Sequence, residues 1–217
     1  MSDGFAGYRA RLVDQLRARG YEDLAILRAF GITPRHLFVP DALQSRAYED
    51  AALPVGRGQT ISQPSTHAAY LQALALRGTE RVLEVGTGTG YQAALLACLA
   101  PQVFTVERVA NLAGQAQRAL IKAGVTNVTV LIGDGTLGWR PYAPYDAVLV
   151  AAAGPQVPPP LLDQLTDGGR LVMPLQGLDA QELIRVTRTG ADYRTEQLGP
   201  VSFVPLIGRH GFDRGTV

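Results

Sequence analysis

The sequence predicts an α/β protein with a doubly wound, mostly parallel sheet, an N-terminal helical extension and C-terminal antiparallel strands. Short apolar runs alternate with helical patterns from about residue 81 onward, which is typical of βαβ units. The first of these runs ends in a glycine-rich turn, Gly86–Gly90, that opens the next helix. The chain has 217 residues, which suits one domain with a substantial core.

Two short amphipathic helices are expected before this alternation begins. This prediction is based on apolar residues at helical spacing, and glycine and proline mark the end of the pattern. The residues are Leu12, Leu16, Leu24, Leu27 and Phe30, followed by Gly31 and Pro34. Residues 51–64 have glycine and proline breaks and almost no periodicity, which predicts an irregular loop before a helix over 65–76. We treat residues 1–217 as a single domain, with an N-terminal part over 1–76 and an α/β core over 77–217.

The core is predicted as alternating strands and helices. The expected strands cover 81–85, 102–106, 127–132, 146–151 and 170–173, and the expected helices cover 90–100, 110–123 and 161–165. The later runs 182–188 and 192–206 alternate around Gly190, which predicts an antiparallel hairpin at the sheet edge. Ligands of such sheets bind beyond the carboxyl ends of the strands, where the strand order reverses.

Composition and charge exclude several classes of protein. Lys and Arg total 20 against 19 Asp and Glu, so no overall basic field indicates a nucleic-acid partner. The longest apolar run, residues 93–100, is too short to span a membrane. The N-terminus has no apolar signal core, and Cys98 is the only cysteine and is expected in the core. These features predict a cytoplasmic protein that does not bind membranes.

The glycine-rich turn indicates the class of ligand. Glycines let the backbone approach a ligand, and the start of the helix offers free N–H groups to an anion. The third glycine, Gly90, falls one position earlier than in the dinucleotide motif, and Glu84 lies two residues before Gly86. An acid at that position suits an ammonium group, so S-adenosylmethionine fits better than a dinucleotide.

Two further acids follow the next two predicted strands. Glu107 lies twenty-one residues after Gly86, the spacing at which an acid binds ribose hydroxyls. Asp134 follows the third strand between Gly133 and Gly135, where it is placed to accept from an adenine amino group. Because parallel strands end at one edge of the sheet, these residues and Glu84 predict one site for an adenosyl ligand with an amino-acid tail.

The segment ahead of the first core strand allows a family to be identified. The run Ala52–Pro64, with Gly-Gln-Thr-Ile-Ser-Gln-Pro at its end, closely resembles the signature loop of protein-L-isoaspartate O-methyltransferases. The resemblance covers nearly the whole chain, although Ser65 and Thr66 depart from the family pattern and residues 208–217 match nothing. Its other matches are residues 34–39, 86–92, 106–108, 133–135, 144–147, 167–172 and 203–206.

This resemblance implies a Rossmann-like methyltransferase fold and a role in protein repair. The enzyme would transfer a methyl group from S-adenosyl-L-methionine, without a metal, to the free α-carboxylate of L-isoaspartyl residues in damaged proteins and peptides. S-adenosyl-L-homocysteine would be the product, and the ester would then close to a succinimide. The chain is expected to act as a monomer.

The resemblance also assigns roles to individual residues. Ser62 matches the active-site serine, and a second group contacts the isoaspartyl substrate: Gln59, Thr60, Ile61, Val204, Pro205 and Leu206. A third group would hold the cofactor. Glu84, Gly86, Thr87 and Gly88 lie at its methionine end, Glu107 and Arg108 at the ribose, and Asp134 and Gly135 at the adenine.

The residue chemistry agrees with this reaction. An α-carboxylate has a pKa of about 3.3–3.7, so at pH 7 it is already an anionic nucleophile and needs no general base. The signature loop offers hydroxyls and amides but no His, Cys or carboxylate, so we expect Ser62 to orient the acceptor by hydrogen bonding. His36, His67 and His210 belong to no hydrolase motif, and no residues have metal-ligand spacing.

Two other functions remain open from the sequence. One is a methyltransferase that acts on a different acceptor, such as a small metabolite or an aspartate in a modified peptide. The other is a non-catalytic adenosyl-binding protein that keeps the fold. The intact run Gln59–Pro64 argues against the first, and the intact cofactor acids argue against the second.

Overall fold

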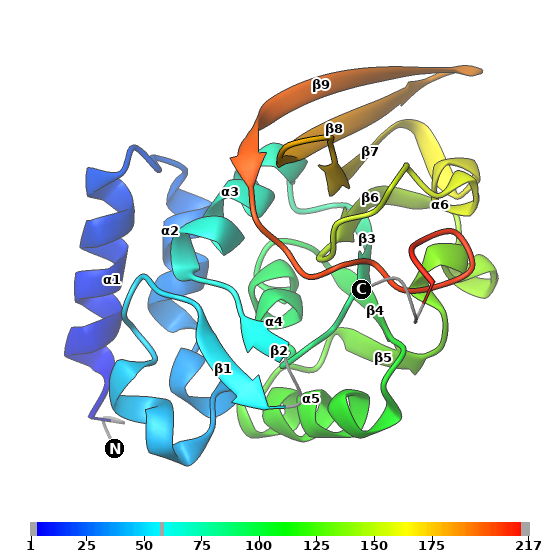
Figure 1. Cartoon of the computed structure of the whole chain (residues 1–217). Coiled ribbons are helices and arrows are strands. Elements are labelled where there is room, and N and C mark those ends of the chain that lie inside the picture. Colours follow the sequence, from blue (N-terminus) through cyan, green and yellow to red (C-terminus); the bar gives the residue numbers. More distant parts are fainter. Residues whose placement is uncertain (1–3, 57–58, 214–217) are drawn as a thin grey trace.

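The computed structural model describes residues 4–56 and 59–213, which form a seven-stranded sheet flanked by helices (Figure 1). The strand order is β5-β4-β3-β6-β7-β8-β9. The first five strands in that order are parallel, β8 is antiparallel to β7, and β9 is antiparallel to β8. The strands are β3 (Arg81–Val85), β4 (Gln102–Glu107), β5 (Val128–Ile132), β6 (Tyr145–Val150), β7 (Leu165–Gln176), β8 (Gln181–Thr189) and β9 (Asp192–Val201). The predicted mostly parallel sheet with C-terminal antiparallel strands is confirmed.

The strand order reverses beside β3. This strand pairs with β4 on one side and with β6 on the other. Strands β4 and β5 are added in chain order on the first side, and β6 is then added on the second side of β3. The loops that follow β3 and β6 therefore diverge at the carboxyl ends of these two strands, which are Val85 and Val150. This is the position where sheets of this type bind ligands.

The helices cover the sheet unequally. Alternate residues of each strand point to opposite faces, so Val82 joins one apolar cluster and Leu83 the other. The N-terminal helices and α3 and α4 pack on the first face, whereas the short α6 and two 3₁₀ turns (Gly135–Leu137 and Arg140–Tyr142) cover the second. The helices are α1 (Ala6–Ala18), α2 (Leu24–Ile32), α3 (Pro64–Leu74), α4 (Tyr91–Ala97), α5 (Ala110–Lys122) and α6 (Pro159–Asp163).

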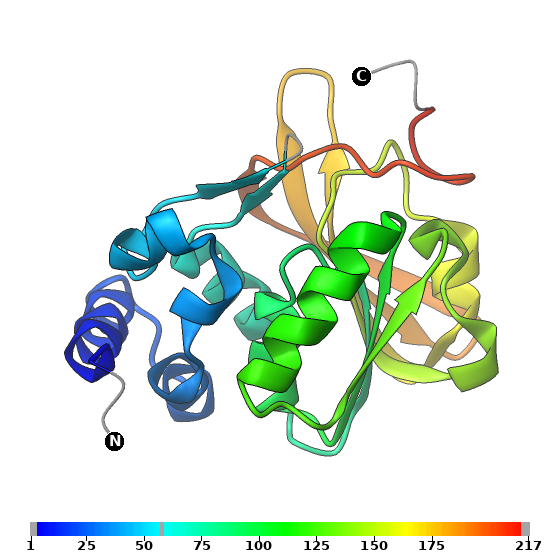
Figure 2. The same ribbon diagram turned by 90° about the horizontal axis from the view of Figure 1, so that it is seen from below.

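The segment predicted as an irregular loop over 51–64 is partly regular, so that prediction was wrong. It contains β1 (Leu53–Gly56) and β2 (Gln59–Ile61), which pair antiparallel with Leu53 opposite Ile61. Two strands of four and three residues are too short to show a period in the sequence. Figure 2 shows this hairpin on the same side of the molecule as the segment that follows β9.

The prediction that Cys98 lies in the core was also wrong. Helix α4 ends at Ala97, three residues before the predicted end, and Cys98 becomes its exposed C-cap residue. Its thiol still donates to the Ala94 carbonyl over 3.4 Å. The apolar run continues past the helix, so the sequence pattern does not mark this end.

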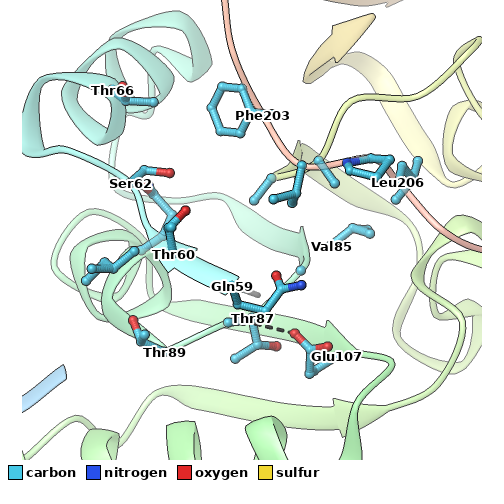
Figure 3. Close-up of a pocket in the computed structure, with 18 of the residues that line it drawn as sticks. Gln59, Thr60, Ser62, Thr66, Val85, Thr87, Thr89, Glu107, Phe203 and Leu206 are labelled. Atoms are coloured by element: carbon cyan, nitrogen blue, oxygen red, sulfur yellow. Dashed lines mark hydrogen bonds between the residues drawn. The ribbon is translucent and has the colours of Figure 1, made fainter. Parts of the chain in front are cut away.

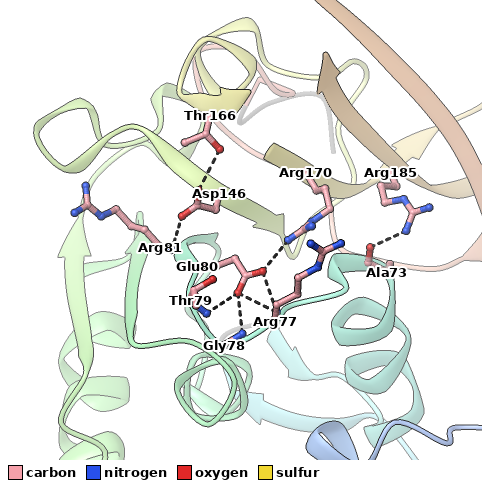
Figure 4. A network of polar contacts seen from close by, with 10 residues as sticks. All are labelled: Ala73, Arg77, Gly78, Thr79, Glu80, Arg81, Asp146, Thr166, Arg170 and Arg185. Atoms are coloured by element: carbon pink, nitrogen blue, oxygen red, sulfur yellow. Dashed lines mark hydrogen bonds and ion pairs between the residues drawn. The ribbon is translucent and has the colours of Figure 1, made fainter. Parts of the chain in front are cut away.

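A buried carboxylate stabilises the sheet where β3 begins, at the end opposite to the carboxyl ends of the parallel strands. Glu80, just before β3, accepts hydrogen bonds from the backbone N–H groups of Arg77, Gly78 and Thr79, and it pairs with Arg170 of β7 at 3.1 Å (Figure 4). These bonds outweigh the effect of burial and lower the pKa of Glu80. The start of β3 is thereby tied to Arg170 of β7, away from the carboxyl ends of the parallel strands.

Candidate active site

A cavity of about 690 Å³ lies at the carboxyl ends of β3, β4 and β6, within the size range of small-molecule sites (Figure 3). The glycine loop and the ends of the strands form its floor. Strand β2 with the start of α3 forms one wall, and the segment after β9 forms another. The lining includes the predicted residues Gln59, Thr60, Ile61, Ser62, Gly86, Thr87, Gly88, Glu107, Arg108, Gly135, Val204, Pro205 and Leu206.

All three glycines of the loop, Gly86, Gly88 and Gly90, have positive φ, a backbone conformation that other residues rarely adopt, and two of these positions also matter for packing and space. Gly90 has φ 87°, and a Cβ there would lie 3.2 Å from the Ala116 Cβ of α5. Gly88 has φ 53°, and a Cβ there would meet no atom within 4 Å. The first position lets α4 and α5 pack closely, and the second leaves open space at the cavity floor.

Glu107 links the glycine loop to the next strand. One carboxylate oxygen accepts from the Gly88 N–H at 3.0 Å, and the other accepts from the Val109 N–H at 3.0 Å. The side chain is buried but lines the cavity. A ligand with hydroxyl groups at this position would find an oriented carboxylate acceptor.

Glu84 does not line the cavity, because it lies behind Thr87. The carboxylate accepts from the Thr105 hydroxyl at 2.5 Å, and that hydroxyl is 2.6 Å from the hydroxyl of Thr87, which does line the cavity. The second oxygen of Glu84 is buried and has no hydrogen-bond partner. Burial, more than the nearby Glu107, raises the pKa of Glu84 to about 8. Two hydroxyl groups therefore separate this acid from the cavity.

Asp134 also lies outside the lining, although Gly135 beside it is part of it. Its carboxylate accepts from the backbone N–H groups of Thr136 and Arg209, at 2.9 and 2.8 Å. Burial acts to raise the pKa of Asp134, but these hydrogen bonds outweigh it and lower the pKa. An ionised carboxylate thus stands next to one end of the cavity.

A buried arginine that sequence reasoning did not single out supports the wall with Ser62. Arg35 is fully buried, and its guanidinium donates to the backbone carbonyls of Ser62 and Ala47, each at 2.7 Å. It also lies over the ring of Tyr91, 4.6 Å from the ring centroid. The only feature of the sequence that could have indicated a role for Arg35 is its place in the family-like run 34–39, because arginine is rarely buried.

The wall after β9 is fixed by backbone bonds. Ala153 donates to the Val204 carbonyl at 2.8 Å and accepts from the Leu206 N–H at 2.7 Å. The side chain of Gln181 forms two hydrogen bonds with the backbone of Phe203, the residue before Val204. Phe203 lines the cavity and was not among the predicted residues, although it begins the family-like run 203–206.

His67 lines the cavity beside Ser62 and is paired with another lining residue. Its Nδ1 is hydrogen bonded to the Gln92 side chain, and its buried Nε2 has no partner. Burial first, and then the nearby Arg35 cation, lower the pKa of His67 to about 3. The ring is therefore neutral at pH 7.

Within residues 4–56 and 59–213, no three His, Cys, Asp or Glu side chains gather in a way that would hold a metal ion. In the same ranges no helix has both the length and the apolar character needed to cross a membrane.

Comparison with known proteins identifies the family of the chain. Residues 8–211 match the family model described as protein-L-isoaspartate(D-aspartate) O-methyltransferase. A protein-L-isoaspartate O-methyltransferase of Syntrophus aciditrophicus is 51% identical over 98% of this chain and 99% of its own length, and one of Methanoculleus marisnigri is 52% identical over 91% and 90%.

Solved structures have the same fold. A protein-L-isoaspartate O-methyltransferase structure superposes with a TM-score of 0.85 at 29% identity, covering 94% of this chain and 67% of that one. A putative one from Plasmodium falciparum, in complex with S-adenosyl-L-homocysteine, has a TM-score of 0.81 at 23% identity, covering 91% of this chain and 97% of that one. The chain belongs to the protein-L-isoaspartate O-methyltransferase family.

Proposed function

We propose that this chain transfers a methyl group from S-adenosyl-L-methionine to the free α-carboxylate of L-isoaspartyl residues in damaged proteins and peptides. Membership of the family supports the reaction. One structural observation carries the proposal for the site: a single cavity is lined by the glycine loop with Glu107 and also by Ser62 with the segment 203–206. A cofactor and a polypeptide acceptor would thus share one space.

The residues of the cavity fit this cofactor. The open space at Gly88 admits a ligand close to the backbone, and Glu107 presents acceptors for ribose hydroxyls. The Thr87 hydroxyl, which lines the cavity, would accept a hydrogen bond from the ammonium group at the methionine end, and Glu84 would act behind it through the Thr105 hydroxyl without touching the ligand. When bound, the cofactor supplies an electrophilic methyl group on a sulfonium. We assign Gly86, Arg108, Asp134 and Gly135 to the same site.

The chain's own contribution is positioning of the acceptor. An isoaspartyl α-carboxylate is ionised at pH 7, so no residue has to remove a proton from it. Ser62 would donate its hydroxyl to this carboxylate, and Gln59, Thr60 and Ile61 of the same wall would contact the surrounding chain. Val204, Pro205 and Leu206 would hold its backbone from the opposite wall. Alignment of the two reactants and exclusion of water then supply the rate enhancement.

Ester formation completes the enzyme's share of repair. The methyl ester gives the α-carboxyl carbon a better leaving group than the free acid has, so the neighbouring backbone nitrogen attacks it, the C–O bond to the methoxy group breaks, and a succinimide closes while methanol leaves with the proton of the nitrogen. Hydrolysis of that ring returns part of the material to the normal aspartyl linkage. We further infer that the protein is cytoplasmic, works as a monomer and binds neither nucleic acid nor membranes.

A methyl-transfer assay with paired peptides tests the proposed function. The two peptides have the same sequence and differ only in an aspartyl or isoaspartyl linkage at one residue. We expect labelling of the isoaspartyl peptide alone, with one S-adenosyl-L-homocysteine formed for each methyl group transferred. Equal labelling of both peptides would reject the proposal and favour a different acceptor. Cofactor binding without labelling of any acceptor would favour a non-catalytic binding protein.

A further inference from the structure

The chain does not simply end after the cavity wall, because residues 206–213 fold into a tight turn. Within this C-terminal turn the Phe212 N–H donates to the Leu206 carbonyl at 2.7 Å, and the Gly211 N–H donates to the Gly208 carbonyl at 3.0 Å. Figure 1 shows the turn in red near α6, and Figure 2 shows it beyond the ends of the strands, on the same side of the molecule as the β1–β2 hairpin. The reaction proposed above gives no role to residues 208–213.

The turn is held by the loop that follows β5. The Arg209 N–H donates to one carboxylate oxygen of Asp134 at 2.8 Å, and the His210 N–H donates to the Thr136 hydroxyl at 3.2 Å. That hydroxyl in turn donates to the other Asp134 oxygen at 2.7 Å. Two hydrogen bonds therefore attach the turn to the loop, and the third connects their acceptors, Asp134 and the fully buried Thr136.

Close packing shows that the turn has one defined position. A Cβ at Gly208 would lie 2.2 Å from an Asp134 carboxylate oxygen and 2.8 Å from a methyl carbon of Thr136. These distances are far below ordinary contact, so only the hydrogen of a glycine fits between the two segments. The contact is thus specific in shape as well as in hydrogen bonding.

The same loop also borders the cavity. Gly135, between the two residues that hold the turn, lines the cavity together with Leu206 and Ile207 of the turn. We propose that the C-terminal turn forms the wall of the cofactor pocket at its nucleoside end, and that Asp134 and Thr136 are positioning residues that hold this wall. The apolar side chain of Ile207 would cover the adenine ring. This inference rests on the proposed function, because that function identifies the ligand as an adenosyl group.

Thr136→Val tests the inference without changing the cavity lining. Valine keeps the shape but removes the hydroxyl, and Thr136 does not line the cavity. We expect the dissociation constant for S-adenosyl-L-homocysteine, measured by calorimetry, to rise about fivefold or more, the equivalent of one lost hydrogen bond. Hydrogen exchange of residues 206–213 should become faster in the ligand-free protein. The KM for S-adenosyl-L-methionine should rise more than the KM for an isoaspartyl peptide, because Leu206 is the one residue of the turn that is assigned to the acceptor.

Matched variants separate this effect from general loss of stability. Thr136→Ser keeps the hydroxyl and should restore binding, whereas Thr166→Val removes a hydroxyl that bonds Asp146 at the opposite edge of the sheet and should leave binding unchanged. Gly208→Ala should displace the turn and weaken binding, whereas Gly7→Ala, with no atom within 4 Å of the added Cβ, should not.

The outcomes distinguish this inference from the proposed function. Wild-type affinity in both Thr136→Val and Gly208→Ala, or faster exchange of the turn with unchanged affinity, would overturn the inference alone. A wild-type protein that does not bind S-adenosyl-L-homocysteine would overturn the proposed function and this inference with it. Because calorimetry needs no acceptor, failure of isoaspartyl methylation alone would leave the expected loss of affinity in the variants as support for the inference.

Discussion

The carboxylate of Glu107 accepts a hydrogen bond from the Gly88 N–H at 3.0 Å, so the end of β4 fixes the glycine loop that follows β3. The other carboxylate oxygen fixes the start of α5 through the Val109 N–H. Glu107→Ala frees both N–H groups and removes the proposed ribose contact. We expect the affinity for S-adenosyl-L-homocysteine to fall by about 1–3 kcal/mol, measured by isothermal titration calorimetry.

The matched control for this variant is Glu22→Ala. Glu22 is exposed and does not line the cavity, so its loss should leave the affinity unchanged. If Glu107→Ala binds the ligand as tightly as the wild-type protein, Glu107 does not contact the ribose.

Ser62→Ala tests the acceptor side of the site. The Ser62 side chain lies at the cavity wall opposite Glu107 (Figure 3), so loss of its hydroxyl removes a donor to the acceptor carboxylate but leaves the cofactor wall intact. We expect kcat for an isoaspartyl peptide to fall about tenfold or more, with unchanged affinity for S-adenosyl-L-homocysteine. Ser45→Ala, at an exposed position, serves as the control. A defect confined to cofactor affinity would place Ser62 in the cofactor site instead.

Glu84 predicts how stability depends on pH. Its pKa rises from an ordinary value of 4.5 to about 8 in the folded chain, mainly because of burial. The folded state thus binds the proton more tightly than the unfolded state. This contribution to stability is fully present below pH 4.5 and is lost as the pH rises through about 8. We expect Glu84 to lower the free energy of unfolding by several kcal/mol across that window.

Glu84→Gln isolates this contribution. Glutamine has similar shape and cannot ionise, so the difference in unfolding free energy between wild type and variant should change with pH between 4.5 and 8 in favour of the variant. Urea denaturation at a series of pH values, without cofactor, measures this difference. If the difference in unfolding free energy between wild type and variant is the same at pH 5 and pH 8, folding does not raise the pKa of Glu84.

The sequence predicted the sheet well because its strands are buried on both faces and read as continuous apolar runs between turn signals. It also predicted which strand ends carry acids. It did not predict which of these acids line the cavity, because that depends on the register of neighbouring strands. Glu84 pairs with Thr105 across β3 and β4, and this register turns its carboxylate toward the Thr105 hydroxyl instead of the cavity.

Other features could not be predicted for different physical reasons. The β1–β2 hairpin is stabilised by its contact with the rest of the molecule, including the buried Leu53 and Ile61, and not by a local period. The C-terminal turn depends on contacts with Asp134, which lies 75 residues from its partner Arg209. Contacts over such separations leave no local pattern in one sequence.

His67 gives a prediction for the pH dependence of the reaction. Its pKa of about 3 keeps the ring neutral above pH 5, and the acceptor carboxylate is already ionised there. We therefore expect the rate of methyl transfer to an isoaspartyl peptide, measured in single-turnover assays, to be constant between about pH 5 and pH 7. An inflection near pH 6.5 that disappears in His67→Gln would show that the ring ionises during catalysis.

Arg35 connects folding stability to the placement of Ser62. Arg35→Met leaves the buried Ala47 carbonyl and the partly buried Ser62 carbonyl without their donor, so we expect the free energy of unfolding to fall by about 2–4 kcal/mol. Arg35→Lys keeps a cation but cannot form both bonds with the same geometry, so its stability should be intermediate.

The Arg35 variants should impair methyl transfer to the acceptor more than they impair cofactor binding. Release of the Ser62 backbone should lower kcat for an isoaspartyl peptide more than it lowers affinity for S-adenosyl-L-homocysteine, because Glu107 and the glycine loop do not contact Arg35 through any described hydrogen bond. Arg28→Met, at an exposed position of α2, controls for loss of a positive charge. If Arg35→Met is as stable and active as Arg28→Met, Arg35 does not hold this wall of the cavity.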